Sequence, residues 1–429
     1  MTAADDPGAP AWLRDGASHV WLPYTQMQTA SPPVAVTATE GVRLTLADGR
    51  QLVDGISSWW TACHGYNHPH IVAAVERQLK TMPHVMFGGI VHEQALTLAK
   101  RLAALLPDGL DRVFFSDSGS VAVEVAMKMA IQFSLNRGET GRNKFVAFRH
   151  GYHGDTLGTM SVCDPEGGMH ALFKGCLLDQ IVVDLPRTTG QRQDFDSLLK
   201  RRRGEIAGVI VEPLVQGAGG MKFHDAETLA FVAKAAARHD VLFIADEIMT
   251  GFGRTGRMFA CEEAEAVPDI VCLSKALTGG TMGLAATIAS RRVFEAFLSD
   301  RPEAALMHGP TYMANALACA AANASLDLFE TEPRLAQVAT IEEHLSAALE
   351  ACRDMKDVKD VRVKGAIGVV ELDPMRDLDW LRRRFVELGT WLRPFGNVIY
   401  TTPPFVVSPN DLATLTDAMI AAVGEWGRR

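Results

Sequence analysis

The chain lacks the features that would place it in a membrane, in an oxidising compartment or on nucleic acid. It has no run of about 18 apolar residues, the length that a membrane-spanning helix needs. Its seven cysteines are scattered, without a C-x-x-C pair, which is typical of reduced thiols and not of disulfides or a zinc site. A net charge of −9 is not the basic excess that non-specific nucleic-acid binding requires. The start, MTAADDPGAPAWLRDG, lacks the basic and then apolar order of a signal peptide, so we expect a cytoplasmic protein.

The chain does have enough apolar material for a large core, since 48% of its 429 residues are hydrophobic and 22% are charged. From about residue 70, segments with helical spacing alternate with short, continuous apolar runs. Such runs are typical of strands buried on both faces of a parallel sheet. We expect these strands at residues 112–115, 144–148, 181–183, 208–212, 241–246 and 270–273. Helices are expected at 71–81, 121–133 and 226–239, with Asp225 as the N-cap of the third.

The ends of the chain carry a second pattern of strands. Apolar runs occur at 34–37, 42–46 and 51–54, and Asp48-Gly49 between the last two predicts a hairpin turn. Further strands are expected at 358–363, 366–372 and 391–400. We therefore expect an α/β protein in which residues 61–325 form a large domain with a mainly parallel sheet, while both termini, 1–60 and 326–429, form a smaller α/β domain.

Residues 251–256, GFGRTG, satisfy the G-x-G-x-x-G pattern of dinucleotide-binding proteins and follow an expected strand. The surroundings contradict that interpretation. Asp246 and Glu247 end the strand where a pyrophosphate would lie, and their charges would repel it. Arg254 and Arg257 flank no obvious start of a helix. We therefore reject a nicotinamide-dependent dehydrogenase.

Two groups of histidines have spacings found among metal ligands: the first group is His64, His68 and His70, and the second is His150 and His153. No acidic or cysteine partner lies at a supporting interval from either group. We therefore expect structural or cofactor-adjacent roles for these histidines, and no metal site.

Chemically useful side chains follow several of the expected strands directly. Glu212, Asp246 and Lys275 each come at or just after the end of an apolar run, and Gly119 and Ser120 begin an expected helix. Ligands of open α/β sheets bind at this edge. A lysine held where its pKa can fall can form a Schiff base with an aldehyde, and a buried carboxylate can keep a pyridine nitrogen protonated. Free amides at a helix N-terminus can hold a phosphate, so the set predicts a pyridoxal 5′-phosphate (PLP) site.

Three of these features together resemble the class III PLP-dependent aminotransferases: residues 242–256 (LFIADEIMTGFGRTG), the 29 positions from Asp246 to Lys275, and residues 309–315 (GPTYMAN). The resemblance covers nearly the whole chain. It implies the fold-type I architecture of PLP-dependent transferases and a homodimer whose active sites lie at the interface between the subunits.

The resemblance also implies roles for individual residues. Lys275 would be the Schiff-base lysine, and Asp246 would pair with the pyridine nitrogen of the cofactor. The remaining cofactor-binding residues would be Gly119 and Ser120 at the phosphate, Thr311 of the partner subunit at the same phosphate, Tyr152 stacked on the ring, and Glu212 beside it.

Further motifs narrow the resemblance to the adenosylmethionine–8-amino-7-oxononanoate aminotransferases of biotin synthesis. They are residues 21–24 (WLPY), 57–60 (SSWW), 64–69 (HGYNHP), 84–89 (HVMFGG), 167–170 (GGMH) and 392–395 (LRPF). The implied amino donor is S-adenosylmethionine, and the implied acceptor, 8-amino-7-oxononanoate, is an aliphatic chain that ends in a carboxylate. Tyr24, Trp59 and Trp60 could line an apolar tunnel for this chain, and Arg393 could form a two-pronged pair with its carboxylate.

The donor carries a sulfonium cation, which Tyr152 and Asp155 could meet with an aromatic face and a carboxylate. Met86 and Gly88, with Gly309, would come from the partner subunit.

Taken singly, the same residues have simpler interpretations. Paired tryptophans are more often part of a core, and a lone arginine more often lies on the surface. Another class III enzyme acting on an ω-amine or an ornithine-like donor remains an alternative, although Trp59, Trp60 and Arg393 together argue against it. A regulator that binds PLP without turnover would not need the complete pair of Lys275 and Asp246.

Overall fold

The computed structural model describes residues 9–167 and 169–428. Residues 1–8, the first half of the segment without signal-peptide order, lie outside the described residues, as do Gly168 of the 167–170 motif and Arg429 at the end of the expected small domain. The chain divides into two compact units. One comprises Met1–Ser58, Cys63–His68 and Thr340–Arg429, and the other comprises Trp59–Ala62 and Pro69–Ala339. The larger unit extends past residue 325, where we expected the large domain to end.

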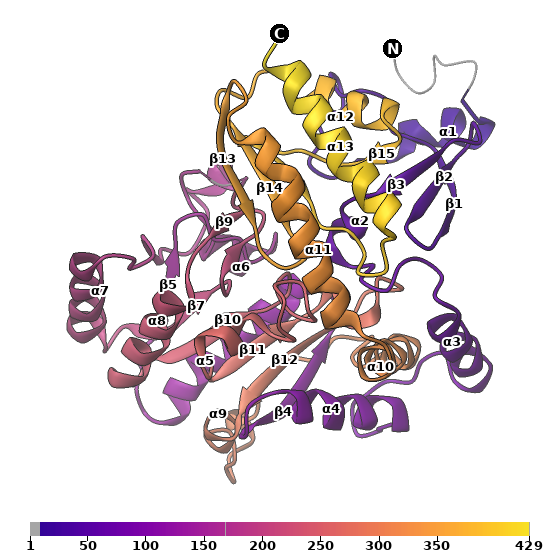
Figure 1. The fold of residues 1–429 in the computed structure, drawn as a ribbon. Helices are drawn as coiled ribbons and strands as arrows, with labels where there is room; N and C mark the ends of the chain where they lie inside the picture. Colours follow the sequence, from indigo (N-terminus) through magenta and orange to yellow (C-terminus); the bar gives the residue numbers. More distant parts are fainter. Residues whose placement is uncertain (1–8, 168, 429) are drawn as a thin grey trace. The chain divides into compact units, whose positions relative to one another are not determined.

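A seven-stranded sheet forms the centre of the larger unit (Figure 1). β12 runs antiparallel to both of its neighbours, and the other strands share one direction. The mainly parallel sheet is therefore confirmed, while β12 was not predicted. In spatial order the strands are β4 (Leu110–Ser116), β12 (Ala285–Ser290), β11 (Ile270–Leu273), β10 (Leu242–Asp246), β7 (Ile206–Val211), β5 (Lys144–Phe148) and β6 (Ile181–Val183).

Polar side chains cap the N-termini of helices in the larger unit. Ser118 accepts a hydrogen bond from the amide of Val121 at the start of α5, and Asp225 accepts one from Thr228 at the start of α8. The predicted N-cap at Asp225 is thus confirmed. The helices are α3 (Pro69–Thr81), α4 (Glu93–Leu105), α5 (Gly119–Asn136), α6 (Leu157–Ser161), α7 (Thr189–Arg202), α8 (Ala226–Arg238), α9 (Arg291–Glu295) and α10 (Ala316–Thr331).

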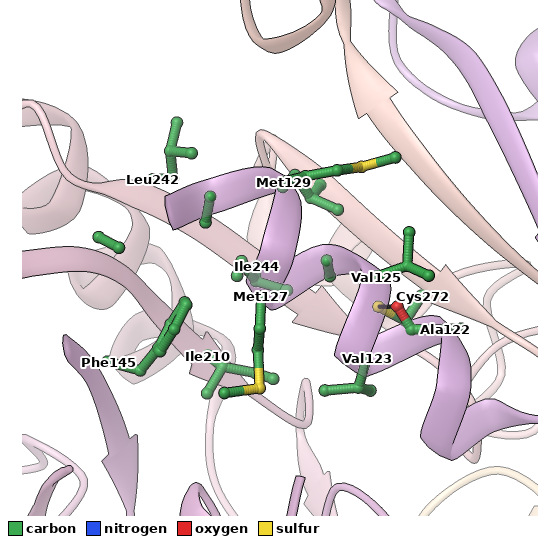
Figure 2. Close-up of a cluster of buried hydrophobic side chains, with 14 of the residues drawn as sticks. Ala122, Val123, Val125, Met127, Met129, Phe145, Ile210, Leu242, Ile244 and Cys272 are labelled. Carbon is green, nitrogen blue, oxygen red and sulfur yellow. Dashed lines mark hydrogen bonds between the residues drawn. The ribbon is translucent and has the colours of Figure 1, made fainter. Parts of the chain in front are cut away.

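Helix α5 is buried against the sheet, which explains why its sequence is apolar almost all round. Val125 and Met129 of the helix belong to one buried cluster with Phe145, Ile210 and Ile244 of the strands (Figure 2). Burial of such side chains stabilises the fold by roughly 1.5–3 kcal/mol each. The packing fixes α5 on the sheet, with its first turn just past the end of β4.

The smaller unit contains two sheets. One is four-stranded, in the order β1 (Val36–Glu40), β2 (Arg43–Leu46), β3 (Gln51–Asp54) and β15 (Thr390–Trp391). The other is three-stranded, in the order β13 (Val358–Val363), β14 (Gly368–Leu372) and β16 (Val398–Thr401). The helices of this part are α1 (Ala11–Gly16), α12 (Leu378–Glu387), α13 (Pro409–Trp426) and α11 (Arg334–Leu349), which spans the division between the units.

The predicted hairpin is confirmed, because β2 and β3 pair antiparallel and Gly49 adopts a φ of +86° in the turn. The single strand expected at 391–400 is wrong. β15 and β16 belong to different sheets, and the chain between them contains Pro394, which has no amide to donate, and Gly396, with a φ of +51°. The parallel pairing of β15 with β3 joins the two termini in one sheet.

Residues 251–256, which match the dinucleotide-binding pattern, lie in consecutive turns, and no helix begins there. No helix in the described part of the chain is long and apolar enough to cross a membrane.

Candidate active site

The ends of two neighbouring parallel strands bring Lys275 and Asp246 to the same edge of the sheet. Asp246 pairs in register with Cys272, three residues before Lys275. Burial lowers the pKa of Lys275 to about 8, although the carboxylates of Asp246, Glu212 and Asp155 act in the opposite direction. A lysine with this pKa has an appreciable neutral fraction near pH 7 and can act as a nucleophile or base.

Asp246 is buried and held by defined donors. Its Oδ2 accepts a hydrogen bond from Nδ1 of His153 at 2.7 Å, and its Oδ1 accepts one from the amide of Ile248 at 3.1 Å. Burial alone would lower the pKa of His153, but the hydrogen bond and charge of Asp246 outweigh it and raise the pKa. These two hydrogen bonds fix the orientation of the Asp246 carboxylate at the strand end.

Glu212 also lies at this edge. Its carboxylate accepts hydrogen bonds from the amides of Tyr152 and Gly217, each at 2.9 Å. Burial raises the pKa of Glu212 to about 7, although the charge of His153 acts against the shift. Glu212 thus anchors the segment that carries Tyr152.

The N-terminus of α5 lies just past the end of β4. The first amides of an α-helix have no intrahelical acceptor, so those of Gly119 and Ser120 are available to an anion. The hydroxyl of Ser120 is already engaged, because it lies 2.8 Å from the hydroxyl of Thr156 and 3.0 Å from that of Thr159. Ser120 therefore offers an anion its backbone amide and not its side chain.

Tyr152 and Asp155 are brought together with a histidine that the sequence did not single out. Oδ1 of Asp155 accepts hydrogen bonds from the hydroxyl of Tyr152 and from Nε2 of His170, each at 2.9 Å. The rings of Tyr152 and His170 stack with their centroids 5.8 Å apart. The motif at 167–170 thus contributes His170 to the group around Tyr152.

Trp59 and Trp60 end an unusual turn, α2 (Ser57–Trp60). All four of its residues have positive φ, between +47° and +70°, so α2 is a left-handed helical turn without glycine. Left-handed geometry costs about 1–2 kcal/mol per residue, so the turn needs support. Trp60 is buried, and its ring lies 4.3 Å from Nζ of Lys275, whereas Trp59 is 38% exposed.

The support comes from a buried carboxylate at the end of β3. Asp54 accepts hydrogen bonds from the amides of Ile56 and Ser58, at 2.8 and 2.9 Å, and from the hydroxyl of Tyr66 at 2.5 Å. The hydroxyl of Ser57 donates to the carbonyl of Thr402 at 2.7 Å.

The remaining predicted residues lie in two places. Tyr24 and Arg393 belong to the smaller unit, where burial and the charge of Arg382 lower the pKa of Arg393. Four lie exposed on the larger unit: Met86, Gly88, Gly309 and Thr311.

The sequence presents His153 only as one of two closely spaced histidines, and His170 only as the last residue of the 167–170 motif. The spacing of His150 and His153 is the one signal in the sequence, and it does not reveal the contact of His153 with Asp246 at the end of β10. Among residues 9–167 and 169–428, no three His, Cys, Asp or Glu side chains gather in a way that could hold a metal ion.

Comparison with known proteins places this arrangement in a family. The family described as aminotransferase class-III matches residues 24–423. A protein of Mycobacterium leprae named adenosylmethionine-8-amino-7-oxononanoate aminotransferase is 46% identical over 420 residues, which cover 96% of each chain. A protein of the same name from Corynebacterium glutamicum is 45% identical, over 94% of this chain and 96% of the relative.

Solved structures agree. The aminotransferase of that name from Methanocaldococcus jannaschii superposes with a TM-score of 0.91 at 34% identity, covering 96% of this chain and 98% of the other. A PLP-bound amine transaminase from an uncultivated Pseudomonas species gives a TM-score of 0.87 at 31% identity, covering 95% and 98%. With a family match over most of its length and such relatives, the chain belongs to the class III aminotransferases.

Proposed function

We propose that this chain transfers the amino group of S-adenosylmethionine to the ketone of 8-amino-7-oxononanoate, giving 7,8-diaminononanoate in biotin biosynthesis. The observation that supports aminotransferase activity is the position of Lys275 at a strand end next to Asp246. There, burial lowers the pKa of the lysine to about 8. The named substrates rest on the full-length relatives that bear this enzyme's name.

The residues at this edge fit PLP as the cofactor. They provide an amine for its aldehyde, a buried carboxylate for its pyridine nitrogen and free helix amides for its phosphate. Bound there, PLP would supply an electron sink for the negative charge that develops on the carbon next to the transferred amino group. Asp246, held by His153, would keep the ring nitrogen protonated, and Tyr152 would cover the ring.

Lys275 has two tasks in this proposal. Its neutral amine would hold the aldehyde carbon of the cofactor between turnovers. Once the substrate amine has replaced it, the same Nζ would take a proton from the donor carbon in the first half-reaction. In the second half-reaction it would deliver a proton to the acceptor carbon that gains the amino group. A pKa of about 8 suits both tasks, because neither protonation state of the amine is then far out of reach near neutral pH.

The substrate contacts are proposed from side-chain chemistry. Tyr24, Trp59 and Trp60 would line the path of the aliphatic acceptor, and Arg393 would bind its carboxylate. Tyr152 and Asp155 would face the sulfonium of the donor, an arrangement in which His170 keeps the carboxylate and the ring together.

A homodimer completes the site in this proposal. Met86, Gly88 and Gly309 would reach the substrate of the partner subunit, and Thr311 would reach its cofactor phosphate. All four are exposed in the single chain, which supports this proposal. We also propose that the protein works in the cytoplasm, in keeping with seven cysteines that are not joined in disulfides.

The deciding experiment follows the absorbance of the bound cofactor while one amine at a time is added to the purified, PLP-loaded protein. We expect S-adenosylmethionine to convert the cofactor to its amine form, and glutamate, ornithine and 4-aminobutyrate to leave the spectrum unchanged. Conversion by another amine but not by S-adenosylmethionine would leave the aminotransferase and overturn the donor. A protein that does not take up PLP would overturn the cofactor.

The acceptor assignment is tested at Arg393. Replacing Arg393→Ala removes the cation proposed for the carboxylate of 8-amino-7-oxononanoate, and a charged hydrogen-bonded pair contributes about 1.5–3 kcal/mol. We expect KM for this acceptor to rise at least about tenfold, while KM for S-adenosylmethionine stays within about twofold. Arg383→Ala, on the exposed part of α12, is the matched control. Equal losses for both substrates would contradict the assignment.

A further inference from the structure

Five polar side chains lie at intervals of four residues along α5, on a helix that is otherwise mostly apolar. They are Ser120, Glu124, Lys128, Gln132 and Asn136. Residues four apart lie on the same side of a helix, so these five form one polar row. We call it the α5 row.

The first two members of the α5 row hold the segment that leads from Tyr152 into α6. Oε1 of Glu124 accepts hydrogen bonds from the hydroxyl of Thr156 at 2.6 Å and from the amides of Gly158 and Thr159 at 2.9 and 3.3 Å. Ser120 accepts a further bond from the amide of Thr156 at 3.1 Å. Glu124 thus caps α6 from outside, because the first amides of α6 have no acceptor in their own helix.

The segment lies so close to α5 that a side chain at Gly154 or Gly158 would displace Ser120 or the carboxylate of Glu124. A Cβ on Gly158 would lie 2.2 Å from Oε2 of Glu124, and a Cβ on Gly154, whose φ is +129°, would lie 2.3 Å from Oγ of Ser120. The contact is therefore a close, specific fit and not an incidental hydrogen bond. Residues 152–155 are thus held at Tyr152 by the carboxylate of Glu212 and at Gly154 by the close approach of Ser120.

The other three members of the row hold a second segment. Nζ of Lys128 donates to the carbonyl of Met307 at 2.8 Å, and the side-chain amides of Gln132 and Asn136 donate to the carbonyl of Ala304 at 3.1 and 3.0 Å. This segment leads directly to Gly309 and Thr311, so both halves of the row position parts of the proposed sites.

We propose that Glu124 is a positioning residue for the cofactor: it fixes the segment of Tyr152, His153 and Asp155 relative to the first turn of α5. The proposal rests on the proposed function, in which α5 binds the phosphate at Gly119 and Ser120 while Tyr152 and Asp246 hold the ring. The two ends of one rigid ligand must be bound at a fixed spacing. Glu124, together with Ser120, ties the segment that follows Tyr152 to the phosphate helix.

The test compares Glu124→Ala, Glu124→Gln and the control Glu139→Gln. Glu139 lies just beyond the end of α5, where it pairs with Arg137 and Arg142, so its change removes a carboxylate from the same region without touching the segment. Three readouts are used on apoenzyme and reconstituted enzyme: Kd for PLP from fluorescence quenching, circular dichroism of the bound cofactor in the visible range, and hydrogen exchange of the amides at 156–161.

We expect Kd for PLP to rise at least about tenfold in Glu124→Ala and by less in Glu124→Gln, whose neutral oxygen is a weaker acceptor. The visible dichroism should change, and the amides of Gly158 and Thr159 should exchange faster, while Glu139→Gln behaves like the unmodified chain. A variant with lower melting temperature but unchanged Kd and dichroism would show a merely structural role and overturn the proposal. If Glu124→Ala does not fold, an unchanged Kd in Glu124→Gln has the same force.

None of these readouts requires an amine substrate. A chain that binds PLP as described but does not react with S-adenosylmethionine would contradict the proposed function and leave the role of Glu124 intact.

Discussion

The environment of Lys275 sets burial against charge. Burial disfavours its protonated form and three carboxylates favour it, and burial prevails, so the pKa falls to about 8. The backbone at Lys275 has a φ of +45°, which L-residues rarely adopt and which the surrounding strand ends must hold in place. Both features cost stability in the apoenzyme, and the lowered pKa leaves part of the amine neutral and reactive.

This cost predicts a pH dependence of stability. The unfolded lysine keeps its proton up to about pH 10.5, whereas the folded one loses it near pH 8. Between these values the unfolded state binds more protons, so the stability of the apoenzyme rises with pH. Lys275→Met removes the group, so we expect the apo variant to gain up to about 3 kcal/mol over the parent at pH 7, with the gain disappearing between pH 8 and 10.5.

Urea unfolding of both apoproteins at pH 7, 8, 9 and 10 measures this difference. Lys234→Met, at an exposed position of α8, is the control and should show no such trend. A stability difference at Lys275 that stays constant from pH 7 to 10 would contradict the lowered pKa.

Among the individual residues, the sequence predicted the side chains that directly follow a buried strand, because the end of an apolar run can be recognised in the sequence. Lys275, Asp246 and Glu212 belong to this group. His153 was not predicted as the partner of Asp246, because the two lie 93 positions apart and meet only through the order of the strands. The engagement of the Ser120 hydroxyl with Thr156 and Thr159 was hidden for the same reason.

Among the elements, the left-handed turn α2 has little support from its own sequence. No glycine marks it, and its four residues have no intrinsic preference for positive φ. Its geometry is held by contacts from elsewhere, chiefly by Asp54 at the end of β3. Burial raises the pKa of Asp54, although Tyr66 and three backbone amides act against the shift.

Removing one donor of Asp54 tests this support. Tyr66→Phe keeps the ring and deletes the hydroxyl, which leaves a buried carboxylate with one hydrogen bond fewer. We expect a loss of about 1–3 kcal/mol in the free energy of unfolding, measured in urea. Tyr312→Phe, at an exposed hydroxyl, should change it by less than about 0.5 kcal/mol. A loss no larger at Tyr66 than at Tyr312 would show that the turn does not depend on Asp54.

Strands formed by one continuous apolar run were predicted well. The interrupted run at 391–400 and the antiparallel strand β12 were not. The limits of β6 and β11 match the predicted runs at 181–183 and 270–273. The run at 391–400 is also apolar, but Pro394 and Gly396 divide it between two sheets. β12 was not predicted because its sequence, AATIAS, is a short run of mostly small residues and lacks the continuous large apolar side chains of the other strands.

At the scale of the whole molecule, the proposed dimer makes each active site depend on two chains. Lys275 and Asp246 would serve the site of their own subunit, and Thr311 that of the partner. This division predicts that two inactive variants can restore each other's activity.

Lys275→Ala lacks the amine, and Thr311→Glu places a carboxylate against the phosphate, so each should be inactive alone. After subunit exchange in an equal mixture, half of the dimers are mixed and each has one intact site, so we expect about a quarter of the original activity. A mixture of Lys275→Ala with Asp246→Asn should recover no activity, because both residues serve the site of their own subunit and each site of a mixed dimer then has one defect. If mass spectrometry shows that mixed dimers have formed and the first mixture still recovers no activity, the active sites are not shared between subunits.

The reversed strand β12 also has a consequence for synthesis of the chain. β4 lies at the edge of the sheet and pairs there with β12, which begins at Ala285, long after β4 ends at Ser116. At roughly 5–20 residues per second, β4 and the α5 N-terminus that follows it wait about ten to thirty seconds on the ribosome before that partner exists. For this time an apolar strand has an open edge, which is the kind of surface that chaperones cover and that otherwise pairs with other chains. The cofactor site is therefore assembled late, after more than two thirds of the protein has been made.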